Sequence, residues 1–271
     1  MTNHARFVRA ALAFLVVGGG LSSLQAANIL IVAGTTGLAQ TAATVLSTDL
    51  SGTNTVTVVN TGVPGSLAGY TQIYDTRFDN NPAFTNGEMT QYINFLNAAP
   101  GNAVVLIGEN VGFNTRNIPI NQFISLAGGG GVSTPATTST ASEVVNPGLR
   151  TPNNITTVAF AACGVAVISG SGRYGSAEPS TGGCSLLYGQ GSLSAALTGV
   201  VAVVYDVNFI TSAPNGGAVN EIPFRQNLEQ FAAAAPSAPS LLPIPSTIFL
   251  SIIGLAILFG CYRWGFADSR A

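Results

Sequence analysis

The 271-residue sequence predicts an α/β protein with a single open, mostly parallel sheet and helices on both faces, plus an N-terminal signal peptide and a C-terminal transmembrane helix. Three observations predict this. Short apolar runs alternate with amphipathic segments, which is typical of parallel strands connected by helices. Glycines follow several of the apolar runs directly, where a strand would turn into a helix. Apolar segments with nearby arginines lie at both ends of the chain.

The N-terminal residues have the pattern of an export signal. Arg6 and Arg9 precede an apolar stretch, and small residues follow it up to Ala27. This order is typical of a secretory signal peptide that is cleaved at Ala27. The sequence therefore predicts a signal peptide over residues 1–27 and an exported body over residues 28–235.

The first half of the body carries apolar runs separated by glycine-containing turns. These runs predict buried strands at residues 28–33, 55–60, 70–76 and 103–107. A helix is expected at residues 38–50. A second helix is expected after Thr85, because Thr85 and Glu88 have the spacing of a capping box and an apolar face follows through Leu96.

The second half of the body is less regular. Residues 118–126 predict a helix that ends at four glycines. Residues 132–154 are rich in Thr, Ser, Pro and Asn without periodicity, which predicts either a long surface loop or an excursion with short antiparallel strands. Two further strands and a last helix are expected at residues 157–168, 197–205 and 224–234, respectively.

The ionisable composition limits the possible chemistry. All nine basic residues are arginine, and the single histidine, His4, lies in the predicted signal peptide. The body would therefore lack the usual general base, zinc ligand and Schiff-base amine. A scarcity of Lys and His in a Gly-, Ala- and Thr-rich exported protein would equally explain this composition. The body contains five arginines and ten acids, so a nucleic-acid partner is not expected.

Two cysteines in the body predict a disulfide. Cys163 and Cys184 would close a short loop, and an exported protein meets oxidising conditions. The alternative, Cys163 as a nucleophile, lacks a histidine to activate it. Cys261 falls at the end of the C-terminal apolar segment.

A glycine-framed segment follows the strand expected at residues 103–107. Gly108-x-Asn110-x-Gly112 has the spacing of a nucleophile elbow. Through this segment and the order of its elements, the body resembles the class I glutamine-amidotransferase-like group of flavodoxin-like folds. That group has cysteine at the elbow and a later histidine, whereas this sequence has Asn110 and no later histidine. The resemblance thus implies a fold without glutaminase activity, and Asn110 would either form the turn or face a ligand.

Polar side chains gather after two of the expected strands. Asp75 and Arg77 end the third strand, and Glu109, Asn110 and Arg116 follow the fourth. Open parallel sheets bind ligands at this edge, so these five are the candidate ligand-binding residues. A local ion pair between Asp75 and Arg77 that only orders the loop is the simpler alternative. Asp75 and Glu109 facing an open cleft would instead indicate a glycoside hydrolase with paired carboxylates.

No cofactor is expected. Residues 170–175 match the glycine spacing of dinucleotide-binding proteins, but no convincing helix follows them. We expect neither a nucleotide nor a metal ion to be bound.

The C-terminal residues have the order of a sorting signal. A proline-rich linker, residues 236–247, contains Pro243 and Pro245 on either side of one aliphatic residue. An apolar span at residues 248–266 follows, and it includes Arg263 near its end. This order resembles the PEP-CTERM class of bacterial sorting signals, and especially its VPLPA-type variants.

The resemblance implies an exosortase-type processing enzyme as a partner. It also implies a location in the bacterial cell envelope or an extracellular polysaccharide matrix. The alternative is a permanent single-pass anchor, since about 20 apolar residues span a bilayer. In both cases residues 267–271 form a cytoplasmic tail.

The sequence therefore predicts a non-enzymatic exported protein whose α/β domain binds a ligand or glycan. The alternative function is a surface carbohydrate-active hydrolase.

Overall fold

The computed structural model describes residues 26–52, 54–139, 142–178, 182–211 and 220–233. The predicted apolar part of the signal peptide, the linker with Pro243 and Pro245, the span with Arg263 and the tail lie outside these ranges. Within the described part of the chain, no helix has the length and apolar character needed to cross a membrane.

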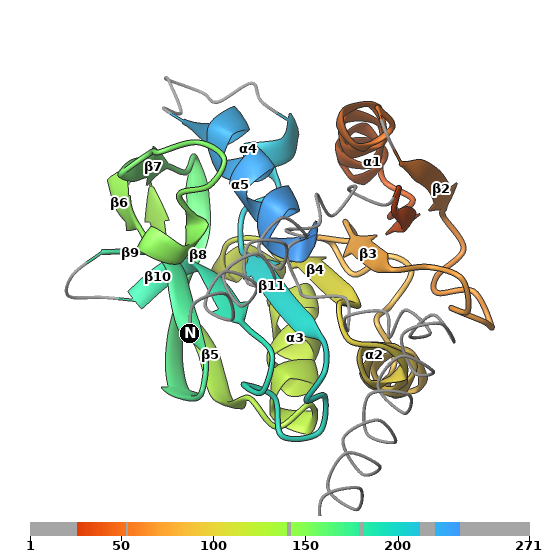
Figure 1. Ribbon diagram of the computed structural model, residues 1–271. Coiled ribbons are helices and arrows are strands. Elements are labelled where there is room, and N and C mark those ends of the chain that lie inside the picture. Colours follow the sequence, from red (N-terminus) through yellow and green to blue (C-terminus); the bar gives the residue numbers. More distant parts are fainter. Residues whose placement is uncertain (1–25, 53, 140–141, 179–181, 212–219, 234–271) are drawn as a thin grey trace, which may run out of the picture.

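Five strands form a parallel block. They are β1 (Asn28–Val32), β2 (Thr55–Val59), β3 (Gln72–Asp75), β4 (Ala103–Ile107) and β11 (Val200–Val204). Their order is β2-β1-β3-β4-β11, and every neighbouring pair is parallel (Figure 1). The strands predicted in this block are all present. β1, β3, β4 and β11 are mostly buried, and strands covered on both faces read as apolar runs, whereas the edge strand β2 is partly exposed and alternates Thr with Val.

Helices cover both faces of this block, as predicted. They are α1 (Gly37–Leu50), α2 (Asn86–Ala98), α3 (Asn114–Leu126), the short α4 (Asn208–Thr211) and α5 (Glu221–Ala233). The core formed by α1, α4 and α5 includes Ile29 and Ile31 of β1. The core formed by α2 and α3 includes Leu30 and Val32, the alternate residues of the same strand. The capping box of α2 is confirmed, since Glu88 N–H donates to Thr85 Oγ1.

Residues 130–188 continue the sheet with antiparallel strands. They are β5 (Gly130–Ser139), β6 (Ser142–Val145), β7 (Thr157–Ala159), β8 (Ala162–Gly170), β9 (Arg173–Glu178) and β10 (Gly182–Tyr188). β10 lies beside β11, and β9, β6 and β7 follow in that order. β8 pairs with both β5 and β10. Two single-turn 3₁₀ helices, η1 (Val111–Phe113) and η2 (Pro147–Leu149), complete the described elements.

The prediction of a mostly parallel sheet is therefore wrong. Four of the ten strand pairs are parallel, and the other six are antiparallel. The physical reason lies in burial. β5 carries mainly Gly, Thr and Ser and exposes most of its described side chains, so it lacks the apolar run that reveals a buried strand. For residues 132–154 the sequence left two alternatives, a long surface loop or short antiparallel strands. The structure confirms the second, since β5 and β6 lie there.

Several boundaries also differ from the prediction. The strand expected at residues 157–168 is divided into β7 and β8. The glycine pattern at residues 170–175 covers the end of β8, the two-residue turn at 171–172 and the start of β9. α3 begins four residues earlier than expected, directly after η1. It ends where predicted, because Gly128 adopts φ +85°, a left-handed conformation that favours glycine.

Candidate functional site

Asp75 is the centre of a buried ion-pair network at the end of β3. Arg77 contacts both oxygens of Asp75, with Nη2 at 2.6 Å from Oδ2 and Nε at 2.9 Å from Oδ1. Arg116 of α3 reaches the same carboxylate, with Nη2 at 2.8 Å from Oδ1. All three side chains are fully buried. Such two-point contacts fix the guanidinium groups in direction as well as in distance.

The surroundings of this network hold each arginine in place. Arg116 Nε donates to the carbonyl of Ile107, and Arg77 Nη1 lies 3.1 Å from Glu88 Oε2. The ring of Phe84 lies against both guanidinium groups, with centroid distances of 5.6 and 5.1 Å. Tyr92 Oη donates to Asp75 Oδ2 at 3.1 Å. α2, α3 and the loop before α2 thus close over the edge of the sheet.

The electrostatics of Asp75 follow from this geometry. Burial alone would raise the pKa of Asp75, but the charges of Arg116 and Arg77 outweigh burial and hold it at about 2. Asp75 therefore stays ionised throughout the physiological range and does not act as a proton donor.

The sequence analysis placed Asp75, Arg77 and Arg116 in a ligand-binding cleft, and the structure corrects this. The three residues converge at the predicted edge of the sheet, but none of them reaches the surface. The ion pair between Asp75 and Arg77, the simpler alternative, is present, and it extends to Arg116. The physical reason is that Asp75 and Glu88 together balance the charges of the two arginines, so no outside anion is needed.

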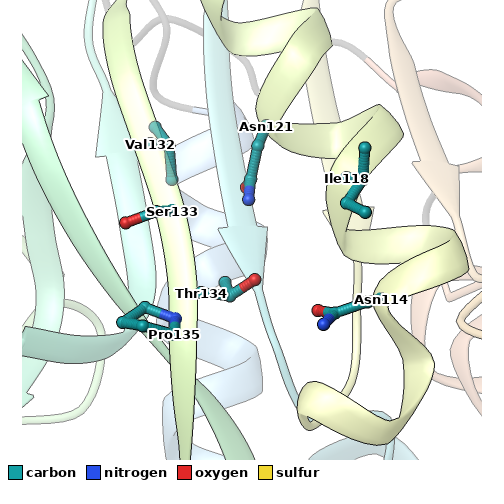
Figure 2. A pocket seen from close by; sticks show the side chains of 7 residues that line it. All are labelled: Asn114, Ile118, Asn121, Val132, Ser133, Thr134 and Pro135. Carbon is teal, nitrogen blue, oxygen red and sulfur yellow. The ribbon is translucent and has the colours of Figure 1, made fainter.

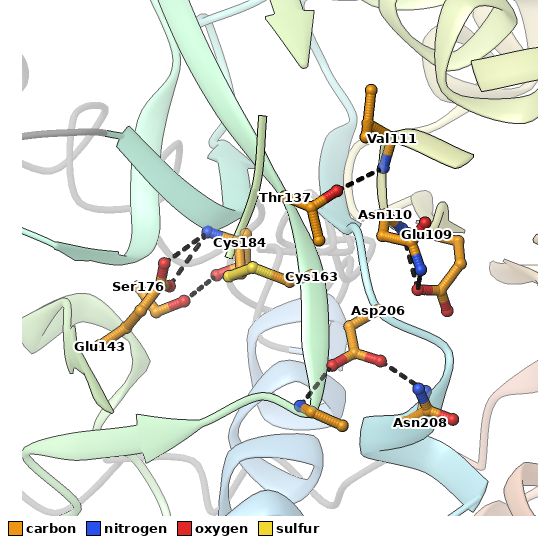
Figure 3. Close-up of a disulfide and its surroundings, with 12 residues drawn as sticks. Glu109, Asn110, Val111, Thr137, Glu143, Cys163, Ser176, Cys184, Asp206 and Asn208 are labelled. Atoms are coloured by element: carbon orange, nitrogen blue, oxygen red, sulfur yellow. Dashed lines mark hydrogen bonds between the residues drawn. A yellow bond between two sulfur atoms is a disulfide. The ribbon is translucent and has the colours of Figure 1, made fainter. Parts of the chain in front are cut away.

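Asn110 shapes the turn after β4. Its Oδ1 accepts from Gly112 N–H at 2.9 Å and so caps η1, and its Nδ2 donates to Glu109 Oε1 at 3.1 Å (Figure 3). Glu109 is 2% exposed, and its Oε2 accepts from Val207 N–H at 3.0 Å. A side chain at Gly108 would collide with Tyr205, so glycine is required there. The described contacts of Asn110 are those of turn structure, and Glu109 joins this turn to the loop after β11.

Asp206 is a buried acid that the sequence analysis missed. It follows β11 and accepts from Ala161 N–H at 3.0 Å and from Asn208 N–H at 2.8 Å (Figure 3). Burial raises its pKa. Burial, together with the nearby Asp206 charge, raises the pKa of Glu109 to about 7. The available signal was an acid directly after an apolar run, at the same sheet edge as Glu109.

The predicted disulfide is present in the antiparallel part of the sheet. Cys163 of β8 is joined to Cys184 of β10, with their Cα atoms 5.6 Å apart (Figure 3). Both carboxylate oxygens of Glu143 accept from Cys184 N–H at 3.0 Å. The three side chains lie close enough to hold a metal ion, but the disulfide commits both sulfurs to each other.

The accessible candidate site is a groove between α3 and β5, hereafter the α3/β5 groove. It has a volume of about 310 Å³. Seven residues line it: Asn114, Ile118, Asn121, Val132, Ser133, Thr134 and Pro135. Figure 2 shows the side chains of Asn114 and Asn121 on α3 and of Thr134 on β5 directed into the space between the two elements. None of the seven lining residues is ionisable.

Two features build this groove. Tyr205 Oη donates to Asn121 Oδ1 at 2.6 Å, which fixes the amide orientation of Asn121. Pro135 lies where the pairing of β5 with β8 shifts register, between Ser133 and Ala136. Proline has no N–H for the ladder, so it is found at such irregular positions. The groove is not predictable from the sequence, because residues 132–154 have no periodic pattern that would locate β5.

Comparisons with known proteins found a solved structure of similar fold. No protein-family model matches the chain, and no curated protein matches it. Among solved structures, the mmIFT52 N-terminal domain has a TM-score of 0.57 at 11% identity and covers 76% of this chain and 97% of its own. A second structure is described as Agd3, a carbohydrate deacetylase, with a TM-score of 0.44 and 14% identity. That match covers 69% of this chain and 31% of the deacetylase. At 11% identity, the likeness to the mmIFT52 N-terminal domain concerns the fold alone.

Proposed function

We propose that this protein is an exported, non-enzymatic protein whose α/β domain binds a neutral glycan in the α3/β5 groove. The observation that carries the proposal is the lining of the groove. Asn114, Asn121 and Thr134 supply amide and hydroxyl groups, while Ile118 supplies an exposed aliphatic surface (Figure 2). Sugars present many hydroxyl groups that both donate and accept hydrogen bonds, and amide and hydroxyl side chains match them without charge.

The groove favours binding over catalysis. General acid–base catalysis requires a titratable group within hydrogen-bond reach of the reacting atoms. The α3/β5 groove offers amides and hydroxyls there, and the acids of the network and of the turn after β4 are buried elsewhere. The hydrolase alternative needs Asp75 and Glu109 to face an open cleft, whereas Asp75 is enclosed and Glu109 is 2% exposed. Glycan binding is therefore the better-supported function.

Binding in the groove is tested by removing two of its polar groups together. The Asn114→Ala, Thr134→Val double variant should bind a neutral glucan roughly thirtyfold more weakly than wild type, since each lost hydrogen bond is worth about 1 kcal/mol. Isothermal titration calorimetry with soluble α- and β-glucans measures this. Asn60→Ala, an exposed asparagine just beyond β2, is the matched control and should bind like wild type. Equal affinity in the groove variant and the control would contradict the proposal.

We also propose that both termini are processed, which accounts for the cell-envelope or matrix location. The sorting proposal rests on the sequence alone: Pro243 and Pro245 lie shortly before the apolar span, in an order that resembles the signals read by a membrane protease of the exosortase type. For the N-terminal cut, Ala27 N–H donates to Asn54 Oδ1 and Ala27 C=O accepts from Thr55 N–H. Cleavage after Ala27, the predicted boundary, would remove both bonds, whereas cleavage before Ala27 would keep them. We therefore propose a cut one residue earlier, with Ala27 as the mature N-terminus.

Processing of the C-terminus is tested on protein recovered from its native envelope. Intact-mass measurement should find wild-type protein without Trp264, the single tryptophan of the chain. A Pro243→Ala, Pro245→Ala double variant should accumulate in the membrane with Trp264 still present, because the altered segment can continue the helix. Wild-type protein that retains an intact tail would refute sorting and leave a permanent membrane anchor.

A further inference from the structure

Three ionisable residues lie along one side of α5, at successive turns of the helix. Glu221, Arg225 and Glu229 are spaced four residues apart, which places them on one side of the helix. Glu221 is 4% exposed and Arg225 is 5% exposed, whereas Glu229 is half-buried. Acids at such positions are normally paired, because burying a lone carboxylate is costly.

Arg225 is already engaged by other groups. Its Nη2 lies 2.6 Å from Asp49 Oδ2 of α1, and its Nη1 donates to the carbonyls of Phe209 and Ile210 in α4. Both glutamates are left with a buried oxygen, Oε1, that has no hydrogen-bond partner within the described residues. A neutral, protonated carboxyl group tolerates such a site better than a carboxylate does.

The elements around α5 add negative charge. Asp206, after β11, raises the pKa of Glu221, and Glu109, after β4, interacts with Asp206 in turn. Asp49 of α1 raises the pKa of Glu229, and Tyr74 of β3 lies near Glu229. Arg225 acts in the opposite direction and lowers the pKa of both glutamates, but burial and the nearby acids outweigh it. The charges around α5 therefore disfavour ionised glutamates.

The remaining elements in contact with α5 offer no compensating charge. Arg150, after η2, donates to the carbonyl of Val145, and β4, β7, β11 and α4 contain no charged residue. In the described part of this region, Arg225 is therefore one cation among five carboxylates.

We propose that docking of α5 on the sheet depends on protonation: with Glu221 and Glu229 neutral the helix is held, and their ionisation loosens it. α5 is the last described element before the proline-rich linker (Figure 1). The pH therefore controls how stably α5, the last described helix, packs on the sheet. This inference does not depend on what the α3/β5 groove binds.

The pKa shifts agree in direction with this geometry. Burial, followed by the charge of Asp206, raises the pKa of Glu221 to about 7. Burial, followed by the charge of Asp49, raises that of Glu229 to about 7. A group with a raised pKa in the folded state contributes stability that is fully present below its unfolded pKa, near 4.5, and is lost as the pH rises through 7. α5 should thus be held best in weak acid.

Hydrogen exchange of the full chain, measured by mass spectrometry at pH 5.5 and pH 8, tests the proposal. After correction for the intrinsic pH dependence of exchange, α5 of the wild type should exchange about tenfold or more faster at pH 8. α2, which is capped by Thr85 and Glu88, is the internal reference and should change little. A Glu221→Gln, Glu229→Gln double variant keeps the shape of the side chains without charge, so its α5 should change by less than about threefold.

The controls separate this mechanism from a general effect of pH. Asp79→Asn removes a carboxylate from the loop after β3 and should keep the wild-type behaviour of α5. Glu109 and Asp206 remain in the double variant, so some pH dependence of overall stability should persist outside α5. Equal protection of α5 at both pH values in the wild type would overturn the proposal. A double variant with the same pH response as wild type would overturn it as well.

Discussion

Replacing Asp75 with Asn should destabilise the domain by about 3–5 kcal/mol, because it leaves two buried arginines without their shared counter-charge. For a domain of this size this corresponds to a fall of roughly 6–20 °C in melting temperature. Thermal unfolding followed by circular dichroism measures it. Arg77 keeps Glu88 as a partner, whereas Arg116 keeps only backbone carbonyls, so most of the loss should arise at Arg116.

The control for this prediction is Asp79→Asn, four residues further along. Asp79 accepts from Asn81 N–H in an exposed contact, so its replacement should cost well under 1 kcal/mol. Since the pKa of Asp75 is held at about 2, below its unfolded value near 3.8, its contribution is present above pH 4 and is lost as the pH falls through 2. Equal melting temperatures for the Asp75 variant and wild type would show that the network is not stabilising.

Removing the disulfide should have the second large effect. Cys163 and Cys184 are 21 positions apart, and closing such a loop stabilises a protein by about 3 kcal/mol in the chain-entropy model. A Cys163→Ala, Cys184→Ala double variant should melt roughly 6–12 °C below wild type. Reduction with a phosphine should lower the melting temperature of the wild type and leave that of the double variant unchanged.

Cys261→Ser is the matched control for the disulfide. Cys261 lies outside the described residues and is not part of the pair, so its replacement should preserve the sensitivity to reduction. Quantitative alkylation of Cys163 and Cys184 in unreduced exported protein would exclude the bridge.

The sequence predicted the fold best for strands that are buried on both faces, because such strands are continuous apolar runs. Ala103–Ile107 was predicted with its observed bounds, because all five residues are buried and apolar. The start of α2 was predicted from Thr85 and Glu88, since a capping box is a local interaction. Arg116 was expected near Asp75 from the rule that the carboxyl ends of parallel strands share one edge, and the two residues do meet there.

The sequence was less informative where contacts between distant residues decide the outcome. Whether Asp75 faces solvent depends on how α2 and α3 close over it, and no local pattern specifies that. β5 is half exposed and rich in Thr and Ser, so it resembles a loop until its partner β8 is known. The α3/β5 groove was missed for the same reason, because one of its two walls was not recognised as a strand.

β11 joins the parallel and antiparallel parts of the sheet, and this has a consequence for the order of folding. Ala103 of β4 pairs with Val200 of β11, 97 positions further along, while β11 pairs with β10 on its other side. Contacts between such distant segments form slowly, because a long loop must close first. Synthesis proceeds from the N-terminus, so β4 is made well before its partner β11. Until β11 has been synthesised, the edge of β4 that pairs with it is apolar and unpaired. The nascent protein is therefore most exposed to aggregation during the synthesis of residues 108–199.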